Sequence, residues 1–493
     1  MLPYRLLIDI DKTCSHPIYL QIVNGFIRQI QNGIVKPATK LPGSRKLAEL
    51  LGVHRKTVVT AMEELYAQGW VELIPYKGTY VASSLPEVRS QKWSPKMINL
   101  TIPDKAGFDF EEIAPIKIPS ILTQRLSFND GYPDVRLAPI EEMATAYARN
   151  LRRHAGSSVL SYGNLYGQES LRAILSDEFN KTRGFRSRID NILITRGSQM
   201  AIYLTINALI RKGEKVVVGE TNYHIANRCF QMVGAEIFRI PVDKDGLVID
   251  ELERLCTQHS FKAIYVTSHH HHPTTVTLIP ERRIQLLALA EKYRFMIIED
   301  DYDYEYHYGN SPVLPLASAD QQGLVVYIGS FSKLTAPVFR LGYVIAPKNV
   351  ITELVKLRRV VDLQGDAVLE LAFAEMMEDG IIRRYLKKAL KQYRIRRNLF
   401  CELLQGKLAD VVHFDVPQGG MAVWASFAEK VDLVELAKVA PKYGIYIGNG
   451  LIHNPPNQCL NSTRLGFAAM NEAEIEEAIT VLEQVIRENF GDL

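Results

Sequence analysis

One lysine in the stretch GSFSKLTAPVFRLGY, residues 329–343, lies among small hydroxyl residues. A lysine amine forms a Schiff base with an aldehyde when the chain holds it nearby and lets it lose its proton. Lys333 is the candidate for such an anchor. Ser330 and Ser332 supply hydroxyl groups, and Arg340 supplies a charged fork that can bind phosphate. The stretch therefore predicts attachment of an aldehyde that also carries a phosphate.

A second candidate group follows an apolar run in FMIIEDDYDYEYHY, which starts at Phe295. Pyridoxal phosphate needs a carboxylate beside its pyridine nitrogen, because the protonated ring acts as the electron sink. Asp300 is the candidate for that carboxylate, and Tyr302 is placed to donate to the phenolic oxygen of the ring. An acid at the end of a strand is common in proteins, so Asp300 carries weight only as a member of a set.

Three further segments complete this set. In TRGSQMAIYLTINALI, Gly197, Ser198 and Gln199 open a helix, and the backbone N–H groups of a helix N-terminus bind phosphate. Tyr223, in GETNYHIANR, offers a ring that can stack on a cofactor. Arg464, in STRLGFA, precedes an apolar strand and can clamp a carboxylate. Core packing, helix capping or an ion pair would explain each residue singly, but the ordered set favours pyridoxal phosphate.

The elements that position these residues follow an α/β pattern. From about residue 130 onward, short apolar runs alternate with longer helical stretches. Continuous apolar runs are typical of a buried, mostly parallel sheet flanked by helices. The expected strands are KVVVGE, KAIYVTS, RFMIIEDDY, LVVYIGSFS and GYVIAP. Such sheets bind ligands beyond the carboxyl ends of their strands, which is where the candidate residues lie.

The N-terminal part of the chain follows the pattern of a winged helix-turn-helix. SHPIYLQIVNGFIRQIQNG predicts a helix with one apolar stripe. LPGSRKLAELLGV predicts a short helix that Ser44 caps and Gly52 ends. After a brief turn, RKTVVTAMEELYAQG predicts a helix whose apolar face includes Val58, Leu65 and Tyr66. Two strands in WVELIPYKGTYVA then predict a wing.

Charge and position indicate that this head binds double-stranded DNA. Residues 1–83 hold ten Lys and Arg against six Asp and Glu, whereas the remaining residues hold 48 against 49. The N-terminal part of a recognition helix contacts bases and phosphates. The candidate DNA-binding residues are Arg45, Arg55, Lys56, Thr57 and Lys77. A structural domain with a solvated charged face is the alternative, but the agreement of helices, turn, wing and charge favours DNA.

The composition is that of a globular protein with more than one domain. The chain has 493 residues, of which 47% are hydrophobic and 23% are charged. We expect no membrane span and no signal peptide. The five cysteines are scattered and form no CxxC pair, which is typical of free thiols in the cytoplasm. The expected organisation is a DNA-binding domain at 10–83, an interdomain linker at 84–124 and a cofactor-binding domain at 125–493.

Both parts of the chain resemble known families. The head resembles the GntR-type winged helix through PIYLQIVNGFIRQI, LPGSRKLAELLGVHRKTVVTAMEELYAQGW and GTYVA. The body resembles the fold-type I aminotransferase domain through SYGNLYGQESLRAILSDEFNKTRGF, ITRGSQMAI, IIEDDYDYEYHYG, YIGSFSKLTAPVFRLGYVIAP and TRLGFA. Over nearly its whole length the chain is therefore similar to the MocR/GabR family of transcriptional regulators.

This resemblance implies a role for each candidate residue. Lys333 would form the internal aldimine with pyridoxal phosphate, Asp300 would face the ring nitrogen, Tyr302 the phenolic oxygen, and Tyr223 would stack on the ring. Arg464 would bind the carboxylate of an effector. The phosphate would be held by Ser330, Ser332, Arg340 and the turn at 197–199, and DNA would be contacted by Arg45 and Arg55. The family also implies a homodimer, which is head-to-tail and domain-swapped in its better understood members.

The sequence departs from the family pattern in three places. Thr221 and Asn222 replace a Pro-Gly pair, His54 replaces the usual serine or threonine, and Thr275 replaces a glycine. The run His269–His272 raises the alternative of a metal site. Neighbours in an extended segment point to alternate sides, so at most two of these rings could share an ion. We expect no metal site, and one or two of the rings as pocket lining.

Three functions are compatible with these features. A regulator would bind DNA through its head and sense pyridoxal phosphate, or an amine or amino acid that reacts with it. An aminotransferase with an accessory head is the alternative, because the Schiff-base residues are intact. A DNA-binding protein whose body serves only for dimerisation is the third. We favour the regulator, because a metabolic enzyme has no need of a recognition helix.

Overall fold

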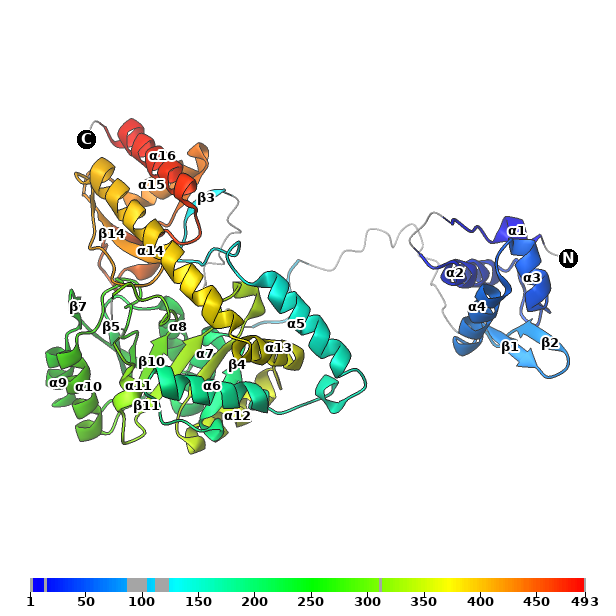
Figure 1. The fold of residues 1–493 in the computed structure, drawn as a ribbon, viewed down its shortest axis with the longest axis horizontal. Helices are drawn as coiled ribbons and strands as arrows, with labels where there is room; N and C mark the ends of the chain where they lie inside the picture. Colours follow the sequence, from blue (N-terminus) through cyan, green and yellow to red (C-terminus); the bar gives the residue numbers. More distant parts are fainter. Residues whose placement is uncertain (1–2, 13–15, 87–103, 111–123, 310–312, 492–493) are drawn as a thin grey trace. The chain divides into compact units, whose positions relative to one another are not determined.

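The computed structural model describes residues 3–12, 16–86, 104–110, 124–309 and 313–491. The chain divides into two compact units between residues 117 and 118 (Figure 1). This division falls inside the segment that we expect to be a linker, and most of that segment lies outside the described residues. The linker and the domain bounds therefore stay predictions.

The first unit is a winged helix, as the sequence predicts. Its elements are α1 (Tyr4–Leu7), α2 (Ile18–Gln31), α3 (Ser44–Leu51), α4 (Arg55–Ala67), β1 (Val71–Ile74) and β2 (Gly78–Val81). β1 and β2 pair antiparallel and form the wing. The core is built around the apolar stripe of α2, where Ile22, Val23, Phe26 and Ile30 are buried.

Two local predictions in this unit are wrong. Ser44 is the first residue of α3 and not its cap, because Gly43 holds the capping position and no side chain caps the helix. Tyr66 is 61% exposed and does not belong to the core. α4 buries Val58, Ala61 and Leu65, whose spacing of three and four defines one stripe, and residue 66 falls outside it.

The second unit is built on a seven-stranded sheet that is mostly parallel. In spatial order its strands are β4 (Ile192–Thr195), β12 (Gly342–Ile345), β11 (Val325–Ser330), β10 (Met296–Asp301), β9 (Ala263–Val266), β5 (Lys215–Gly219) and β6 (Glu236–Ile240). β12 runs antiparallel to both of its neighbours, and the other pairs are parallel. All five expected strands are present. The two edge strands, β4 and β6, were not among them. β6 is only partly buried and lacks a continuous apolar run.

Both faces of this sheet are buried, so side chains alternate between two cores. Ile298 and Ile328 pack on the face that α7 covers, whereas Ile297 and Tyr327 pack on the opposite face. The flanking elements are α5 (Ile140–Arg153), α6 (Glu169–Thr182), α7 (Ser198–Leu209), α8 (His224–Met232), α9 (Ile249–Cys256), α10 (Pro280–Tyr293), α11 (Leu316–Ala319), α12 (Lys348–Val361), α13 (Ala367–Glu378) and the short hairpin β7 (Val242–Asp243) and β8 (Gly246–Leu247).

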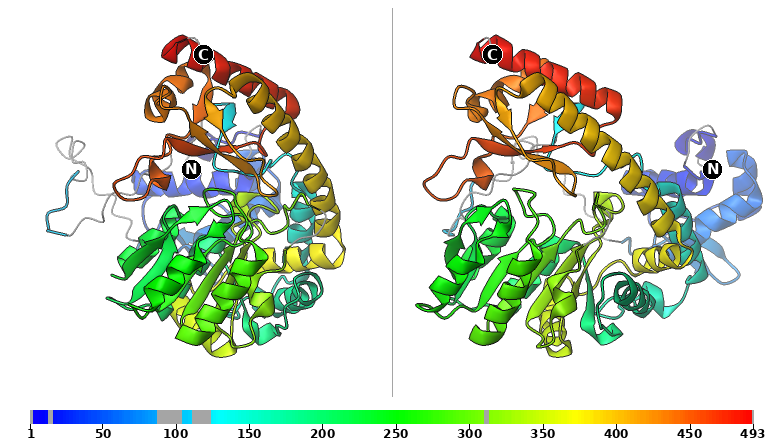
Figure 2. Two further views of the ribbon diagram at one scale, coloured as in Figure 1. Left: turned by 90° about the vertical axis from the view of Figure 1, so that its left-hand side faces the viewer. Right: turned by 60° about the vertical axis from the view of Figure 1, so that its left-hand side comes forward.

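A smaller sheet forms the C-terminal part of the same unit. Its strands are β13 (Val412–His413), β14 (Ala422–Phe427) and β16 (Ser462–Gly466), with α15 (Leu433–Val439) and α16 (Glu472–Phe490). The long helix α14 (Ile381–Leu408) runs from the end of α13 to this sheet (Figures 1 and 2). β3 (Leu126–Phe128) pairs with β15 (Ile445–Ile447), which fixes the segment after residue 128 beside the smaller sheet.

Arg464 lies in the middle of β16 and not before a strand as the sequence suggested. Its pairing partner on β14 is Trp424.

Within the described ranges, no helix is long and apolar enough to span a membrane. The part of the chain that the structure describes contains four cysteines, and all are free thiols, namely Cys229, Cys256, Cys401 and Cys459.

The fully buried ring of Phe26 provides a test of the two-unit division. Phe26→Ala leaves a cavity and should cost about 3–5 kcal/mol, a large part of the stability of a small domain. We expect the winged helix to melt at a lower temperature in scanning calorimetry, while the transition of the second unit stays in place. Tyr66→Ala, which removes an exposed ring, should change neither transition. A common shift of both transitions with Phe26→Ala would show that the two units do not unfold separately.

Candidate cofactor site and nucleic-acid interface

The recognition helix α4 has a histidine cap. The backbone N–H of Lys56 donates to Nδ1 of His54 over 3.2 Å. His54 therefore does what serine or threonine does at this position in the family, which is to satisfy one free N–H group of the first turn. Because Nδ1 accepts, the neutral ring carries its proton on Nε2.

The candidate DNA-binding cations are all exposed. Arg55 and Lys56 lie in the first turn of α4, Arg45 lies in the first turn of α3, and Lys77 lies in the turn of the wing. Thr57 is half-buried. Nε of Arg55 donates to Oγ of Ser44 over 3.4 Å, a contact that brings the starts of α3 and α4 together.

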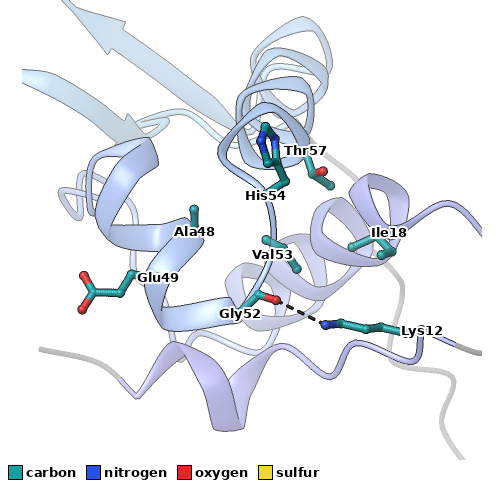
Figure 3. Close-up of a pocket in the computed structure, with 8 residues that line it drawn as sticks. All are labelled: Lys12, Ile18, Ala48, Glu49, Gly52, Val53, His54 and Thr57. Atoms are coloured by element: carbon teal, nitrogen blue, oxygen red, sulfur yellow. Dashed lines mark hydrogen bonds between the residues drawn. The ribbon is translucent and has the colours of Figure 1, made fainter.

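A hollow of about 500 Å³ lies at the turn between α3 and α4, bounded by Gly52, His54 and Thr57 (Figure 3). Nζ of Lys12 reaches across it and donates to the carbonyl of Gly52 over 3.4 Å. The N-terminal segment thus braces the turn that positions the recognition helix.

In the second unit, the predicted cofactor residues gather at the carboxyl edge of the large sheet. β10 and β11 are parallel neighbours, and Asp300 lies opposite Ile328 in their register. Ser330 is the last residue of β11. β4 ends at Thr195, directly before the Gly197 turn, and Thr195 pairs with Gly342 of β12. The carboxyl ends of β4, β10 and β11 therefore share one edge with the amino end of the antiparallel strand β12.

Asp300 is buried and only half satisfied. Tyr265 donates its hydroxyl to Oδ2 over 2.6 Å, whereas Oδ1 is buried without a hydrogen-bond partner. Burial, together with the negative charges of Asp301 and Asp303, raises the pKa of Asp300 to about 7. A buried carboxylate oxygen that lacks a donor fits a protonated pyridine nitrogen, which would supply the missing hydrogen bond and a positive charge.

The predicted phosphate-binding residues also lie close together. Gly197 has φ +80° and precedes α7, whose first N–H groups are free to bind an anion. A Cβ on Gly197 would lie 3.0 Å from Nη2 of Arg340, and one on Gly342 would lie 2.8 Å from the backbone of Gly197. The glycines therefore allow the arginine and two backbone segments to meet. Oγ of Ser332 is buried without a partner, and its backbone N–H donates to Oγ of Ser330 over 3.1 Å.

Tyr223 links the phosphate set to Asp300. Its hydroxyl accepts from Nε2 of Gln199 over 3.3 Å. Burial and the nearby charge of Asp300 raise the pKa of Tyr223, so the two side chains lie within electrostatic reach of each other. Tyr302 donates its hydroxyl to the carbonyl of His270 over 3.1 Å.

Lys333 lies over this edge with a lowered proton affinity. Burial lowers its pKa to about 8, against the opposing effect of Asp130. Nζ donates to the carbonyl of Gly131 over 2.5 Å and lies 5.3 Å from the centre of the Tyr132 ring. The side chain is thus held in place, and near neutral pH a fraction of its amine is uncharged, which Schiff-base chemistry requires.

Arg464 comes to the same place from the smaller sheet, but it already has a carboxylate partner. Nε lies 2.6 Å from Oδ1 of Asp130, and Nη1 donates to the carbonyl of Pro273 over 3.1 Å. The sequence prediction missed Asp130. Its only signal is an acid directly before the Gly-Tyr-Pro-Asp segment, and nothing local connects it to residue 464.

The four histidines are all buried, and each has a different polar partner. Nδ1 of His269 lies 3.0 Å from Asp301, Nδ1 of His270 lies 2.7 Å from Asp303, His271 contacts Thr274, and His272 contacts Asp130. Among these rings, His272 lies beside Tyr223, with 5.1 Å between centroids. Across the described ranges, no group of three or more His, Cys, Asp or Glu is arranged to hold a metal ion.

Thr275 adopts a left-handed backbone conformation, which is the conformation that the family's glycine favours. Its φ is +64°, in the left-handed region where the family's glycine is free of strain and a β-branched residue is rare. A separate hollow of about 460 Å³ opens beside Arg340 and is lined by Arg196, Tyr147 and Asp366 among others. Lys333 and Asp300 do not line it.

The raised pKa of Asp300 predicts a specific pH dependence for the cofactor-free protein. The folded state keeps the Asp300 proton up to a pH of about 7, whereas the ordinary value of 3.8 applies when the chain unfolds. Between these values the folded state binds more protons, so its stability falls as the pH rises. Each pKa unit corresponds to about 1.4 kcal/mol.

Asp300→Asn removes this titration with little change of shape. We expect the melting temperature of the cofactor-free wild type to fall relative to that of Asp300→Asn between pH 4 and pH 7. Above that range the difference should level out. Parallel melting curves of the two proteins across this range would contradict the account of Asp300.

Two families match separate parts of this chain. The family described as Aminotransferase class I and II matches residues 125–482, and the family described as Bacterial regulatory proteins, gntR family, matches residues 18–81. The multiple substrate aminotransferase from Thermococcus profundus superposes with a TM-score of 0.69 and 28% identity, over 74% of this chain and 92% of that one. Aromatic-amino-acid aminotransferase 1 from Thermococcus litoralis is 30% identical over 74% of this chain and 88% of its own length.

A third relative matches both parts at once. The probable rhizopine catabolism regulatory protein MocR from Rhizobium meliloti is 27% identical over 96% of this chain and 94% of its own. The winged helix makes the chain a DNA-binding protein, and the aminotransferase fold with its half-satisfied Asp300 makes pyridoxal phosphate its cofactor. The chain therefore belongs to the MocR family of transcriptional regulators, in which a GntR-type winged helix is joined to a class I and II aminotransferase domain.

Proposed function

We propose that this regulator changes its affinity for an operator when a small amine or amino acid binds in the Lys333 site. The observation that carries the proposal is that one chain has both an exposed basic recognition helix and a buried lysine of lowered pKa at a sheet edge. A ligand shifts the protein only if it binds two arrangements of the heads with different affinity. Pyridoxal phosphate itself, an ω-amino acid such as γ-aminobutyrate, and other amines or amino acids are the effector classes to be compared.

Each residue of the site has a task in this proposal. Pyridoxal phosphate, when bound, supplies an aldehyde and an electron sink. The amine of Lys333 holds it covalently, Asp300 keeps a proton at the ring nitrogen, and Tyr223 covers the ring. The phosphate is held by the 197–199 turn, Ser330, Ser332 and Arg340. The burial of these groups excludes water and keeps the amine of Lys333 partly uncharged.

The proposal includes a homodimer in the cytoplasm. Two winged helices recognise two repeated half-sites on DNA, and a two-fold dimer supplies the two winged helices. The head-to-tail, domain-swapped form is the arrangement that the family suggests.

Transamination is the second candidate activity, and the same lowered pKa of Lys333 favours it. Turnover with pairs of amino acids and keto acids measures that activity directly.

Arg55→Ala tests the DNA-binding surface. Loss of one base or phosphate contact should weaken operator binding by about tenfold or more, as measured by fluorescence anisotropy at physiological salt. The visible absorbance of the bound cofactor should not change, because Arg55 belongs to the other unit. Arg28→Ala, which removes an exposed arginine at the end of α2, is the matched control and should bind DNA normally. Unchanged affinity of Arg55→Ala would remove this residue from the interface.

Lys333→Ala tests the cofactor anchor. The variant should lose the visible absorbance of the covalently held cofactor and should no longer change its DNA affinity when amines are added. The circular dichroism spectrum should stay that of the wild type. Lys348→Ala, which removes an exposed lysine paired with Asp190, should keep the absorbance. A wild-type visible spectrum in Lys333→Ala would show that another group holds the cofactor.

A further inference from the structure

We propose that Asp130 occupies the place of an effector carboxylate, so that the Lys333 site selects primary amines that lack a carboxylate over amino acids. The inference rests on the proposed function, in which a ligand with an amine binds at Lys333. Arg464 is the residue that would otherwise clamp the carboxylate of such a ligand. In this proposal the carboxylate that pairs with Arg464 belongs to the protein and not to the ligand, and Asp130 determines which ligands the site selects.

The guanidinium of Arg464 has contacts on several sides. Oδ1 of Asp130 lies 2.6 Å from Nε in an ion pair that lacks hydrogen-bond geometry, and the carbonyl of Pro273 accepts from Nη1 over 3.1 Å. A Cβ on Gly131 would lie 3.1 Å from Nη2, so Gly131 lies close to the third nitrogen. The side chain of Arg464 is 3% exposed. A ligand carboxylate could reach this arginine only by displacing Asp130.

Asp130 is itself held from the other side. Its Oδ2 lies 3.1 Å from Nε2 of His272, which is buried beside Pro273. Burial lowers the pKa of His272, so the ring is neutral and donates its Nε2–H to the carboxylate. Although burial opposes ionisation, the contacts with His272 and Arg464 hold the pKa of Asp130 well below its ordinary value. Asp130 therefore carries a full negative charge at neutral pH.

This charge lies next to the reacting amine. Asp130 directly precedes Gly131, whose carbonyl accepts from Nζ of Lys333 over 2.5 Å. The side chain of Asp130 keeps 35% of its surface exposed, so an incoming ligand meets its charge. A second carboxylate at this place would be repelled, whereas an ammonium group or a neutral substituent would not.

The walls around Asp130 consist of rings. The Tyr132 ring lies under Nζ of Lys333 at 5.3 Å. The ring of His453 lies 5.5 Å from His272 and 5.5 Å from Trp424, measured between centroids. Such surfaces accept apolar, aromatic or cationic substituents.

The test uses full-length protein with its cofactor, titrated with pairs of compounds that differ only in the α-carboxylate. Suitable pairs are 2-phenylethylamine with phenylalanine, and 1,5-diaminopentane with lysine. Dissociation constants come from the change in visible absorbance and from calorimetry. We expect the amine of at least one pair to bind about tenfold or more tightly than its amino acid. Equal affinity within both pairs, or tighter binding of the amino acids, would overturn the inference.

Asp130→Asn should change the preference, because it removes the charge and frees the fork of Arg464. The affinity for amino acids should rise and that for the matched amines should not. Asp177→Asn, which changes an exposed acid on α6, is the control and should keep the wild-type preference. An Asp130→Asn protein that still rejects amino acids would overturn the inference.

Asp130→Asn also leaves a buried arginine without its partner and is expected to lose stability. Sodium acetate, a carboxylate without an amine, should raise the melting temperature of this variant more than sodium chloride does at equal ionic strength. It should have no such effect on the wild type. If Asp130→Asn does not fold, the neutral pair Asp130→Asn with Arg464→Met replaces it and should bind both members of each pair alike. A retained preference for amines in that double variant would overturn the role of Asp130.

The same titrations separate this inference from the proposed function. If amino acids bind the wild type as tightly as their matched amines or more tightly, and change its DNA affinity, ligand sensing stands and the role of Asp130 is wrong. If neither class of compound changes the cofactor absorbance, while cofactor and DNA still bind, then both ligand sensing by amines and the role of Asp130 are wrong.

Discussion

The burial of consecutive acids at the end of β10 is the constraint on which the site depends. Glu299, Asp300, Asp301 and Asp303 are each less than 5% exposed, and buried carboxylates are costly without partners. Glu299 accepts from Ser268 and from the backbone at the start of α11. Asp301 accepts a hydrogen bond from the hydroxyl of Tyr327 and lies beside His269. Asp303 is hydrogen-bonded to His270. Of these four acids, only Asp300 has a fully buried carboxylate oxygen that lacks a hydrogen-bond partner.

This pairing gives the histidine run a structural reason. Two of its rings serve as partners of Asp301 and Asp303, and a third, His272, serves Asp130. One run therefore supports two acids at the end of β10 and the acid beside Lys333. The left-handed backbone at Thr275 belongs to the turn that follows it, in which the N–H of Thr275 donates to the carbonyl of His271 over 2.7 Å.

The sequence predicts the fold well because the fold follows local patterns. Apolar runs and helix-ending glycines identify the winged helix and five strands of the large sheet, and the motif residues then fall at one sheet edge. Which side chains pair with each other is harder to predict from the sequence. Asp130 meets Arg464 only because β3 pairs with β15 near the C-terminus, a contact between segments more than 300 residues apart that no local pattern encodes. Arg464 inside β16 and the exposed Tyr66 show that positions within an element are also less certain than the element.

The most direct test of ligand-controlled DNA binding is a titration on a specific duplex. Operator DNA would be selected from a random pool with the full-length protein and labelled for fluorescence anisotropy at physiological salt, because low salt inflates non-specific binding. The dissociation constant is then measured for cofactor-free protein, for protein with pyridoxal phosphate, and for the latter with saturating amine. The account predicts a change of about fivefold or more between at least two of these states. The same dissociation constant in all three states would contradict it.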